Sequence, residues 1–131
     1  MSKLSIYDQE VSLRQDVACK YSDRLKDYLE IPYVSSEYLS VWAQYSILLP
    51  NELIRKKVVK SLKDSNIPSM IYYQKPLHVQ KAFSDLGYKF GDFPVSESIS
   101  SRILSLPMHP YLNDSDIDLI CDKIIRVMQE C

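Results

Sequence analysis

The chain has 131 residues, enough for one ordinary domain with one buried core. Hydrophobic residues make up 46% and charged residues 25% of the sequence, as in globular proteins, and the formal net charge is −1. This charge favours neither a nucleic-acid-binding protein nor an acidic disordered regulator. The longest apolar runs are far shorter than the roughly 20 residues that span a bilayer, and the N-terminal residues are too polar for a signal-peptide core. We therefore expect a cytoplasmic protein with no nucleic-acid or membrane partner.

Two kinds of residue are scarce. The only glycines are Gly87 and Gly91, too few for a glycine-rich phosphate loop or a dinucleotide-binding turn. The three cysteines, Cys19, Cys121 and Cys131, form no CxxC pair and have no histidine at ligand spacing. This pattern predicts reduced thiols and no metal site. Tyrosine, by contrast, is frequent, with ten residues that belong either at core edges or in a polar pocket.

The first predicted element is a long helix over residues 4–29. Apolar residues from Leu4 to Tyr28 recur at spacings of three and four, and Arg14 occupies the one polar position on that stripe. Pro32 prevents any continuation. A helix of about 25 residues spans nearly 40 Å, more than a small domain needs. Part of its apolar face is therefore expected to pack on something outside the domain.

The next elements alternate between strands and helices. Residues 41–48 are rich in β-branched and aromatic side chains, which predicts a strand. Residues 51–65 form an amphipathic helix that carries Leu53 and Ile54 inward and Arg55 outward with a row of lysines. Residues 69–73 are expected to form a second short strand.

The C-terminal half continues this alternation. A short helix is predicted around 79–86, another begins near Asp92-Phe93-Pro94, and a third strand covers 102–106. Asn113 is a suitable N-cap for a final helix over 115–129. The pattern predicts an α+β fold, a two-layer αβ domain with a long N-terminal helix and a three-stranded, largely antiparallel sheet covered by helices.

Polar and aromatic side chains follow two of the predicted strands. Residues 72–78 hold two phenols, an amine and an imidazole, and residues 107–111 form a similar segment. Loops at strand ends commonly carry functional sites, and the two segments converge if their strands are neighbours. A loop imidazole is, however, also a common hydrogen-bonding anchor. No nucleophile stands beside a base and no paired carboxylates occur here, so no catalytic residue is predicted.

Several motifs in fixed order resemble one known family: Ile67-Pro68-Ser69-Met70-Ile71-Tyr72-Tyr73, Pro76-Leu77-His78, Leu86-Gly87-Tyr88, Gly91-Asp92-Phe93-Pro94 and Leu104-Ser105-Leu106-Pro107-Met108-His109-Pro110-Tyr111-Leu112. They are similar to the C-terminal region of the DegT/DnrJ/EryC1/StrS family, the pyridoxal-phosphate-dependent sugar aminotransferases. The resemblance covers nearly the whole chain and is strongest to members that act on nucleotide-linked keto amino sugars. Gln74 departs from the pattern, since many relatives have proline there.

The resemblance implies one domain over 1–131, in which 1–30 is a connecting helix and 31–131 is a small αβ C-terminal domain. Family members carry the Schiff-base lysine, the aspartate facing the pyridine nitrogen and the phosphate loop in an N-terminal domain, and none of those motifs matches this sequence. The implied parent transfers an amino group, normally from glutamate, to a keto sugar nucleotide for surface polysaccharide. Its other partners are the PLP domain and a homodimer mate, and this chain alone is expected to bind no PLP and to be inactive. A free-standing, non-catalytic binding or interaction module is the alternative.

The resemblance also implies the site residues. His78 and Tyr73 are expected to contact the sugar or its phosphates, with Tyr72 as a substitute for Tyr73, because alternation along a strand sends only one of the two into a pocket. For His109, contact with the substrate and bracing of its loop both stay open. Arg14 is expected to face a ligand or to form a salt bridge inside the domain. No cofactor-binding or metal-binding residue is predicted.

Overall fold

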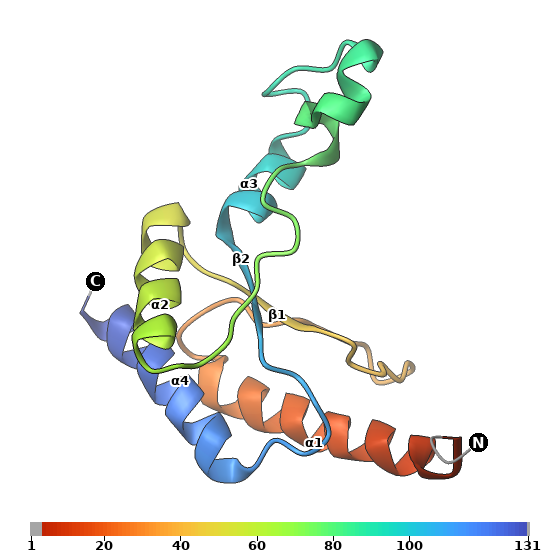
Figure 1. Ribbon diagram of the computed structural model, residues 1–131, viewed down its shortest axis with the longest axis vertical. Coiled ribbons are helices and arrows are strands. Elements are labelled where there is room, and N and C mark those ends of the chain that lie inside the picture. The colour runs from red at the N-terminus through yellow and green to blue at the C-terminus, as the bar shows by residue number, and fades with distance from the viewer. Residues whose placement is uncertain (1–3, 131) are drawn as a thin grey trace.

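The computed structural model describes residues 4–130. After a 3₁₀ turn at Leu4–Ile6, the main elements follow in this order: α1 (Tyr7–Leu25), β1 (Tyr45–Leu48), α2 (Glu52–Asp64), α3 (Pro94–Arg102), β2 (Ile103–Leu106) and α4 (Asp114–Gln129). In Figure 1, α2 and α4 lie against each other and α1 runs along the base of the molecule, with the two strands between them. The predicted α+β class, with a long N-terminal helix and a small antiparallel sheet, is confirmed. Between residues 4 and 130, no helix combines the length and the apolar character needed to cross a bilayer.

One apolar core joins α1, α2, α4 and both strands. Most of the apolar stripe that the spacing predicts on each helix is buried, but Leu53 on α2 and the N-terminal residues Leu4 and Tyr7 are exposed. The side chains with the least exposure are Tyr21, Leu25, Tyr45, Ile47, Leu49, Val58, Leu62, Leu104, Ile117, Cys121 and Ile124. These residues form what we call the body of the molecule.

The sheet has two strands, not the three predicted. β1 and β2 are antiparallel, with Tyr45 opposite Leu106 and Leu48 opposite Ile103. The third segment, 69–73, reaches β2 only at Met70, whose N–H and C=O both bond to Ser105, at 3.0 and 2.9 Å. The segment lies beside β2, but the chain leaves the sheet after one residue pair, and both Tyr72 and Tyr73 are exposed.

The predicted strand 41–48 is also shorter, because the extended backbone begins only at Tyr45. Trp42 has a positive φ of 47°, and this left-handed residue turns the chain just before the strand. Two contacts of the Trp42 side chain hold the residue in this conformation. The indole packs on Tyr45, with 5.5 Å between ring centroids, and its Nε1–H donates to Gln15 on α1 at 2.9 Å.

The first helix ends at Leu25, not at residue 29 as predicted. The chain continues through a turn, in which the N–H groups of Tyr28 and Leu29 donate to the Leu25 carbonyl. Glu30 then pairs with Leu48 at the edge of β1, and this bridge pulls the chain off the helix axis. At the other end, Leu4 and Tyr7 are exposed, so the apolar stripe begins outside the core. The predicted limits of α2, α4 and β2 agree with the structure to within one residue, as helix and strand ends commonly do.

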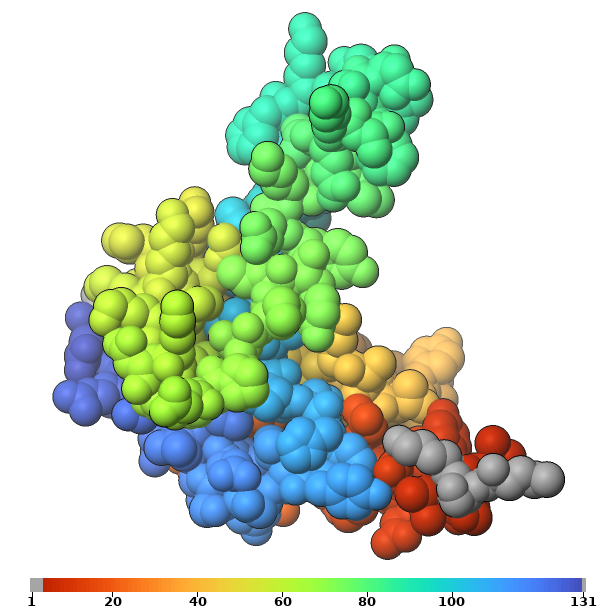
Figure 2. All heavy atoms as spheres, viewed as in Figure 1, coloured from red at the N-terminus to blue at the C-terminus, as the bar shows by residue number. Residues whose placement is uncertain are grey.

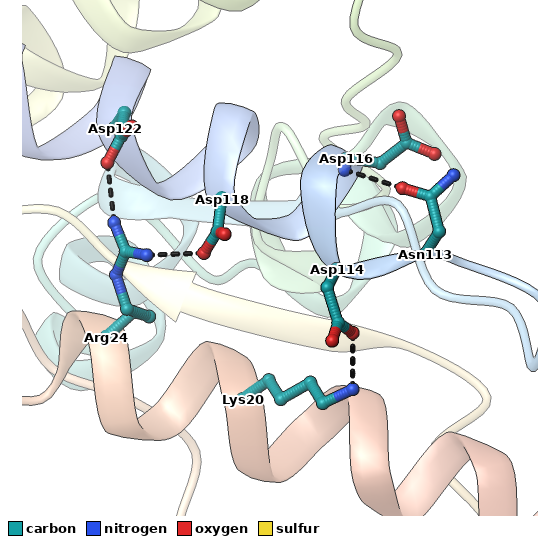
Figure 3. A network of polar contacts seen from close by, with 7 residues as sticks. All are labelled: Lys20, Arg24, Asn113, Asp114, Asp116, Asp118 and Asp122. Atoms are coloured by element: carbon teal, nitrogen blue, oxygen red, sulfur yellow. Dashed lines mark hydrogen bonds and ion pairs between the residues drawn. The ribbon is translucent and has the colours of Figure 1, made fainter.

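Charged side chains join α1 to α4 on the surface (Figure 3). Lys20 contacts Asp114 at 2.5 Å, and Arg24 contacts both Asp118 and Asp122. Beside them, the Asn113 side chain accepts from the N–H of Asp116 at 2.8 Å, which confirms the predicted N-cap of α4. These contacts hold the two helices in register at the edge of the core.

Arg55 is buried, which corrects its predicted outward position. Its Nη1 donates to the Ser100 carbonyl in the last turn of α3 at 2.7 Å. The amphipathic pattern of α2 alone assigns Arg55 to solvent. The packing of α3 against α2 covers it instead, and a cation at a helix C-terminus is favourably placed.

Residues 77–93 extend away from the body, and we call them the arm. Figures 1 and 2 show the arm, in green, protruding beyond α3. The predicted helix at 79–86 is instead two 3₁₀ turns, Leu77–Val79 and Lys81–Leu86, and the second ends at Gly87 with a φ of 76°. Every residue from 81 to 93 is exposed, so no core supports a regular helix there.

Candidate functional site

A groove of about 630 Å³ lies between α3 and residues 73–77, at the base of the arm. We call it the α3 groove. Its walls are mostly apolar, with a few polar groups at the rim, as is common for small-molecule sites. The lining residues are Tyr73, Lys75, Pro76, Leu77, Asp92, Phe93, Pro94, Val95, Ser96, Ile99, Ser100 and Ile103.

The two tyrosines at the end of the third segment face different hollows. Tyr73 lines the α3 groove, whereas Tyr72 lines a smaller cavity of about 190 Å³ beside β2. Met108, from the second polar-aromatic segment, lines the same small cavity as Tyr72. The structure therefore brings the two segments together, and only Tyr73 of the two tyrosines lines the larger hollow.

His78 is buried at the point where the arm joins α3. It is 9% exposed, its Nε2 lies 2.9 Å from Oε1 of Glu97, and its ring packs on Phe93 with 4.9 Å between centroids. The same Glu97 oxygen accepts from the N–H groups of Gly91, at 2.8 Å, and Phe93, at 3.4 Å. Burial alone would raise the pKa of Glu97, but these hydrogen bonds outweigh it and hold the pKa below its usual value. The carboxylate is therefore ionised at neutral pH.

His109 and Arg14 lie elsewhere. His109 is exposed, and its Nδ1 accepts from the N–H of Tyr111 at 3.2 Å, a local contact within its own loop. Arg14 forms no salt bridge within the described residues. Its Nη1 donates to the backbone carbonyls of Trp42, at 3.0 Å, and Met108, at 3.5 Å. Arg14 therefore ties α1 to the start of β1 and to the segment after β2, which corrects the expected ion pair.

Glu97 is the residue of this site that sequence reasoning missed. It lies in the first turn of α3, and its side chain reaches back to the N–H of Phe93, the N-cap residue. This resembles a capping box, in which an acidic side chain in the first turn accepts from the N-cap amide. The signal was present as an acidic residue shortly after Pro94.

The family model described as the DegT/DnrJ/EryC1/StrS aminotransferase family matches residues 1–125. The chain belongs to this family.

Three related proteins illustrate the match. The UDP-2-acetamido-2-deoxy-3-oxo-D-glucuronate aminotransferase of Pseudomonas aeruginosa is 37% identical over 122 residues, which cover 92% of this chain and 32% of that protein. The crystal structure of a DegT DnrJ EryC1 StrS aminotransferase from Brucella abortus is 44% identical with a TM-score of 0.85, and the match covers 95% of this chain and 33% of that one. NtdA from Bacillus subtilis, solved with bound PMP, shares the fold at 22% identity and a TM-score of 0.76, over 92% of this chain and 29% of that one. The chain thus spans about a third of the length of these relatives.

The PLP that the family implies does not fit the described residues. A Schiff-base lysine needs an amine that gives up its proton, which desolvation or a neighbouring cation favours. Between residues 4 and 130 every lysine is exposed except Lys123, which is half-buried. The pKa values of Lys20 and Lys60 are raised by hydrogen bonds to Asp114 and Asp64, the opposite of what the chemistry needs. No group of three His, Cys, Asp or Glu side chains in this part of the chain is placed to hold a metal ion.

Proposed function

We propose that this chain is the C-terminal, substrate-side domain of a PLP-dependent nucleotide-sugar aminotransferase. The observation that carries the proposal is the family match over residues 1–125. The parent protein would transfer an amino group, from glutamate as donor, to a keto sugar nucleotide for surface polysaccharide. PLP would be held by a cofactor domain outside this sequence, where it supplies the carbonyl group that accepts and releases the amino group.

The α3 groove supports a substrate role for this domain. Lys75 and Tyr73 are exposed and line the groove together with mostly apolar residues. A sugar nucleotide also has a charged part and less polar parts, because its diphosphate is anionic while its base and sugar present flat or weakly polar faces. A cation attracts the diphosphate, a phenol donates to a hydroxyl or phosphate oxygen, and the apolar lining displaces water.

The predicted contacts follow from this placement. Tyr73 would contact the substrate in the α3 groove, with Tyr72, which lines the smaller cavity beside β2, as its substitute. His109 would either contact the substrate or brace its own loop. His78 stays a predicted contact, although its Nε2 already bonds to Glu97. A substrate would have to reach the small exposed part of the His78 ring.

The organisation of the protein completes the proposal. Residues 1–30 would connect the cofactor domain to residues 31–131. The exposed side chains of Leu4, in the 3₁₀ turn, and Tyr7, at the start of α1, would pack on the cofactor domain or on a homodimer mate. The protein would act in the cytoplasm. Alone, the 131-residue chain would neither bind PLP nor transfer an amino group.

The test compares the complete gene product with this chain. The DNA upstream of the codon for Met1 is read for an in-phase frame with a lysine motif, and both proteins are assayed with PLP, glutamate and a panel of keto sugar nucleotides. We expect activity and a PLP absorbance band for the complete product and neither for the 131-residue chain. A gene that begins at Met1, whose product binds a sugar nucleotide without turnover, would favour the non-catalytic binding module instead.

A further inference from the structure

We propose that Glu97 is a positioning residue that sets both walls of the α3 groove and so the affinity for the sugar nucleotide, although it does not line the groove. This inference rests on the proposed function and names a residue that the sequence motifs did not single out. Glu97 is 9% exposed and belongs to α3, whereas its hydrogen-bond donors belong to the arm.

The first step is the geometry at a single oxygen. Oε1 of Glu97 receives His78 Nε2 at 2.9 Å, Gly91 N–H at 2.8 Å and Phe93 N–H at 3.4 Å. An ionised carboxylate only accepts hydrogen bonds, so Nε2 of His78 carries a proton that it donates to Glu97. The contact thus fixes the orientation of the imidazole as well as its position, with Nε2 as the nitrogen that faces Glu97.

The second step is where these donors lie in the chain. His78 stands at the beginning of the arm, directly after Pro76 and Leu77, which form one wall of the groove. Gly91 and Phe93 stand at its end, next to Pro94 in the opposite wall. One carboxylate therefore joins His78, near the start of the arm, to Gly91 and Phe93 at its end, and this connection helps to set the distance between the two walls.

The third step is how little else supports the arm at this place, where the other contact between its two ends is the packing of the His78 ring on Phe93, with 4.9 Å between centroids. Residues 81–93 are all exposed, so the arm buries little apolar surface. The far end of α3 is held separately, by Arg55 on the Ser100 carbonyl at 2.7 Å. Loss of the Glu97 carboxylate would therefore free the arm and the groove walls, while α3 stays on the body.

The experiment uses Glu97→Gln, which keeps the size of the side chain and removes its charge. Asp85→Asn is the matched control, because it removes the same charge from an exposed position in the arm. In the 131-residue chain, we expect faster amide hydrogen exchange at Gly91 and Phe93 in Glu97→Gln and wild-type exchange in Asp85→Asn. In the complete gene product, Glu97→Gln should raise KM for the sugar nucleotide about 10-fold, as expected for the loss of roughly one charged hydrogen bond, with kcat and KM for glutamate unchanged.

Other results would contradict the proposal, each at a different step. A purely structural role would lower the melting temperature and kcat while KM for the sugar nucleotide stays the same, and that result would overturn the positioning role. Unchanged exchange at Gly91 and Phe93 would overturn the claim that the charged carboxylate anchors the arm. A complete wild-type product that is inactive on every sugar nucleotide overturns the proposed function and the positioning role with it, whereas an active wild type with unchanged KM in Glu97→Gln overturns the positioning role alone.

Discussion

The hydroxyl of Tyr21 offers a direct test of how α1 is joined to the segment that follows β2. Tyr21 is fully buried, its ring packs on Tyr45 with 5.1 Å between centroids, and its hydroxyl donates to the Pro107 carbonyl at 3.0 Å. Tyr21→Phe removes one oxygen atom and leaves the ring in place. The substitution therefore isolates the hydrogen bond from the packing of the ring.

The expected cost comes from two effects. The net contribution of the hydrogen bond is lost, and the Pro107 carbonyl, which is partly buried, is left without this donor. Together these effects lower the free energy of unfolding by about 1–2 kcal/mol. For a chain of this length, such a change lowers the melting temperature by roughly 3–10 °C.

Urea denaturation followed by circular dichroism measures this difference. Tyr38→Phe is the matched control, because Tyr38 is 73% exposed and the same substitution there should change the free energy by less than about 0.5 kcal/mol. The midpoint should fall for Tyr21→Phe at an unchanged slope. Equal midpoints for the two variants would refute the claim that the Tyr21 hydroxyl joins α1 to this segment.

Three further predictions concern pH and the helix cap. Burial raises the pKa of Cys121 from about 9 to about 12 and that of Tyr45 from about 10 to about 12. Above about pH 9 the unfolded chain therefore releases protons that the native state keeps, and the free energy of unfolding should fall as pH rises. Denaturation at pH 8 to 10.5 should show a smaller fall in Cys121→Ala than in the wild type. The pKa of Glu97 is lowered, so its hydrogen bonds are complete above the usual value of 4.5 and are lost as pH falls through the lowered value. The amide chemical shift of Gly91 should therefore change below pH 4.5 and stay constant above it. Asn113→Ala should cost about 1 kcal/mol in thermal denaturation, and Asn113→Asp should cost little because aspartate also caps, so an equal loss in both would contradict the cap.

The elements that the sequence predicted well are those whose signals are local. Asn51 and Asn113 begin α2 and α4 because a short polar side chain accepts from an amide in the first turn, and this depends on a few neighbouring residues. The stripe of Ile117, Ile120 and Ile124 faces the core for a similar reason, since the spacing of apolar residues along a helix sets its buried face. The order of the motifs also sufficed to identify the family.

The errors share a cause in contacts between distant segments. Arg55 has the spacing of an exposed residue, and only the packing of α3, 45 residues further along the chain, buries it. Residues 69–73 have the composition of a strand, but whether a segment pairs over one residue or five depends on where β2 and the neighbouring chain lie. The pair of His78 and Glu97 is a contact of the same kind, over 19 residues, and it turns an apparently free imidazole into a buried donor.

The residues that stabilise the fold lie in the body, whereas the arm and the residues beside it shape the α3 groove. The body is stabilised by many buried apolar side chains on α1, α2, α4 and both strands, so no single polar contact decides whether it folds. The arm has no buried apolar residue between 81 and 93, and its two ends meet at one carboxylate. Substitutions in the arm can therefore alter the α3 groove at little cost to the fold, while substitutions in the core cannot. If related domains recognise different sugar nucleotides, the arm and the groove beside it are where their sequences can differ without loss of stability.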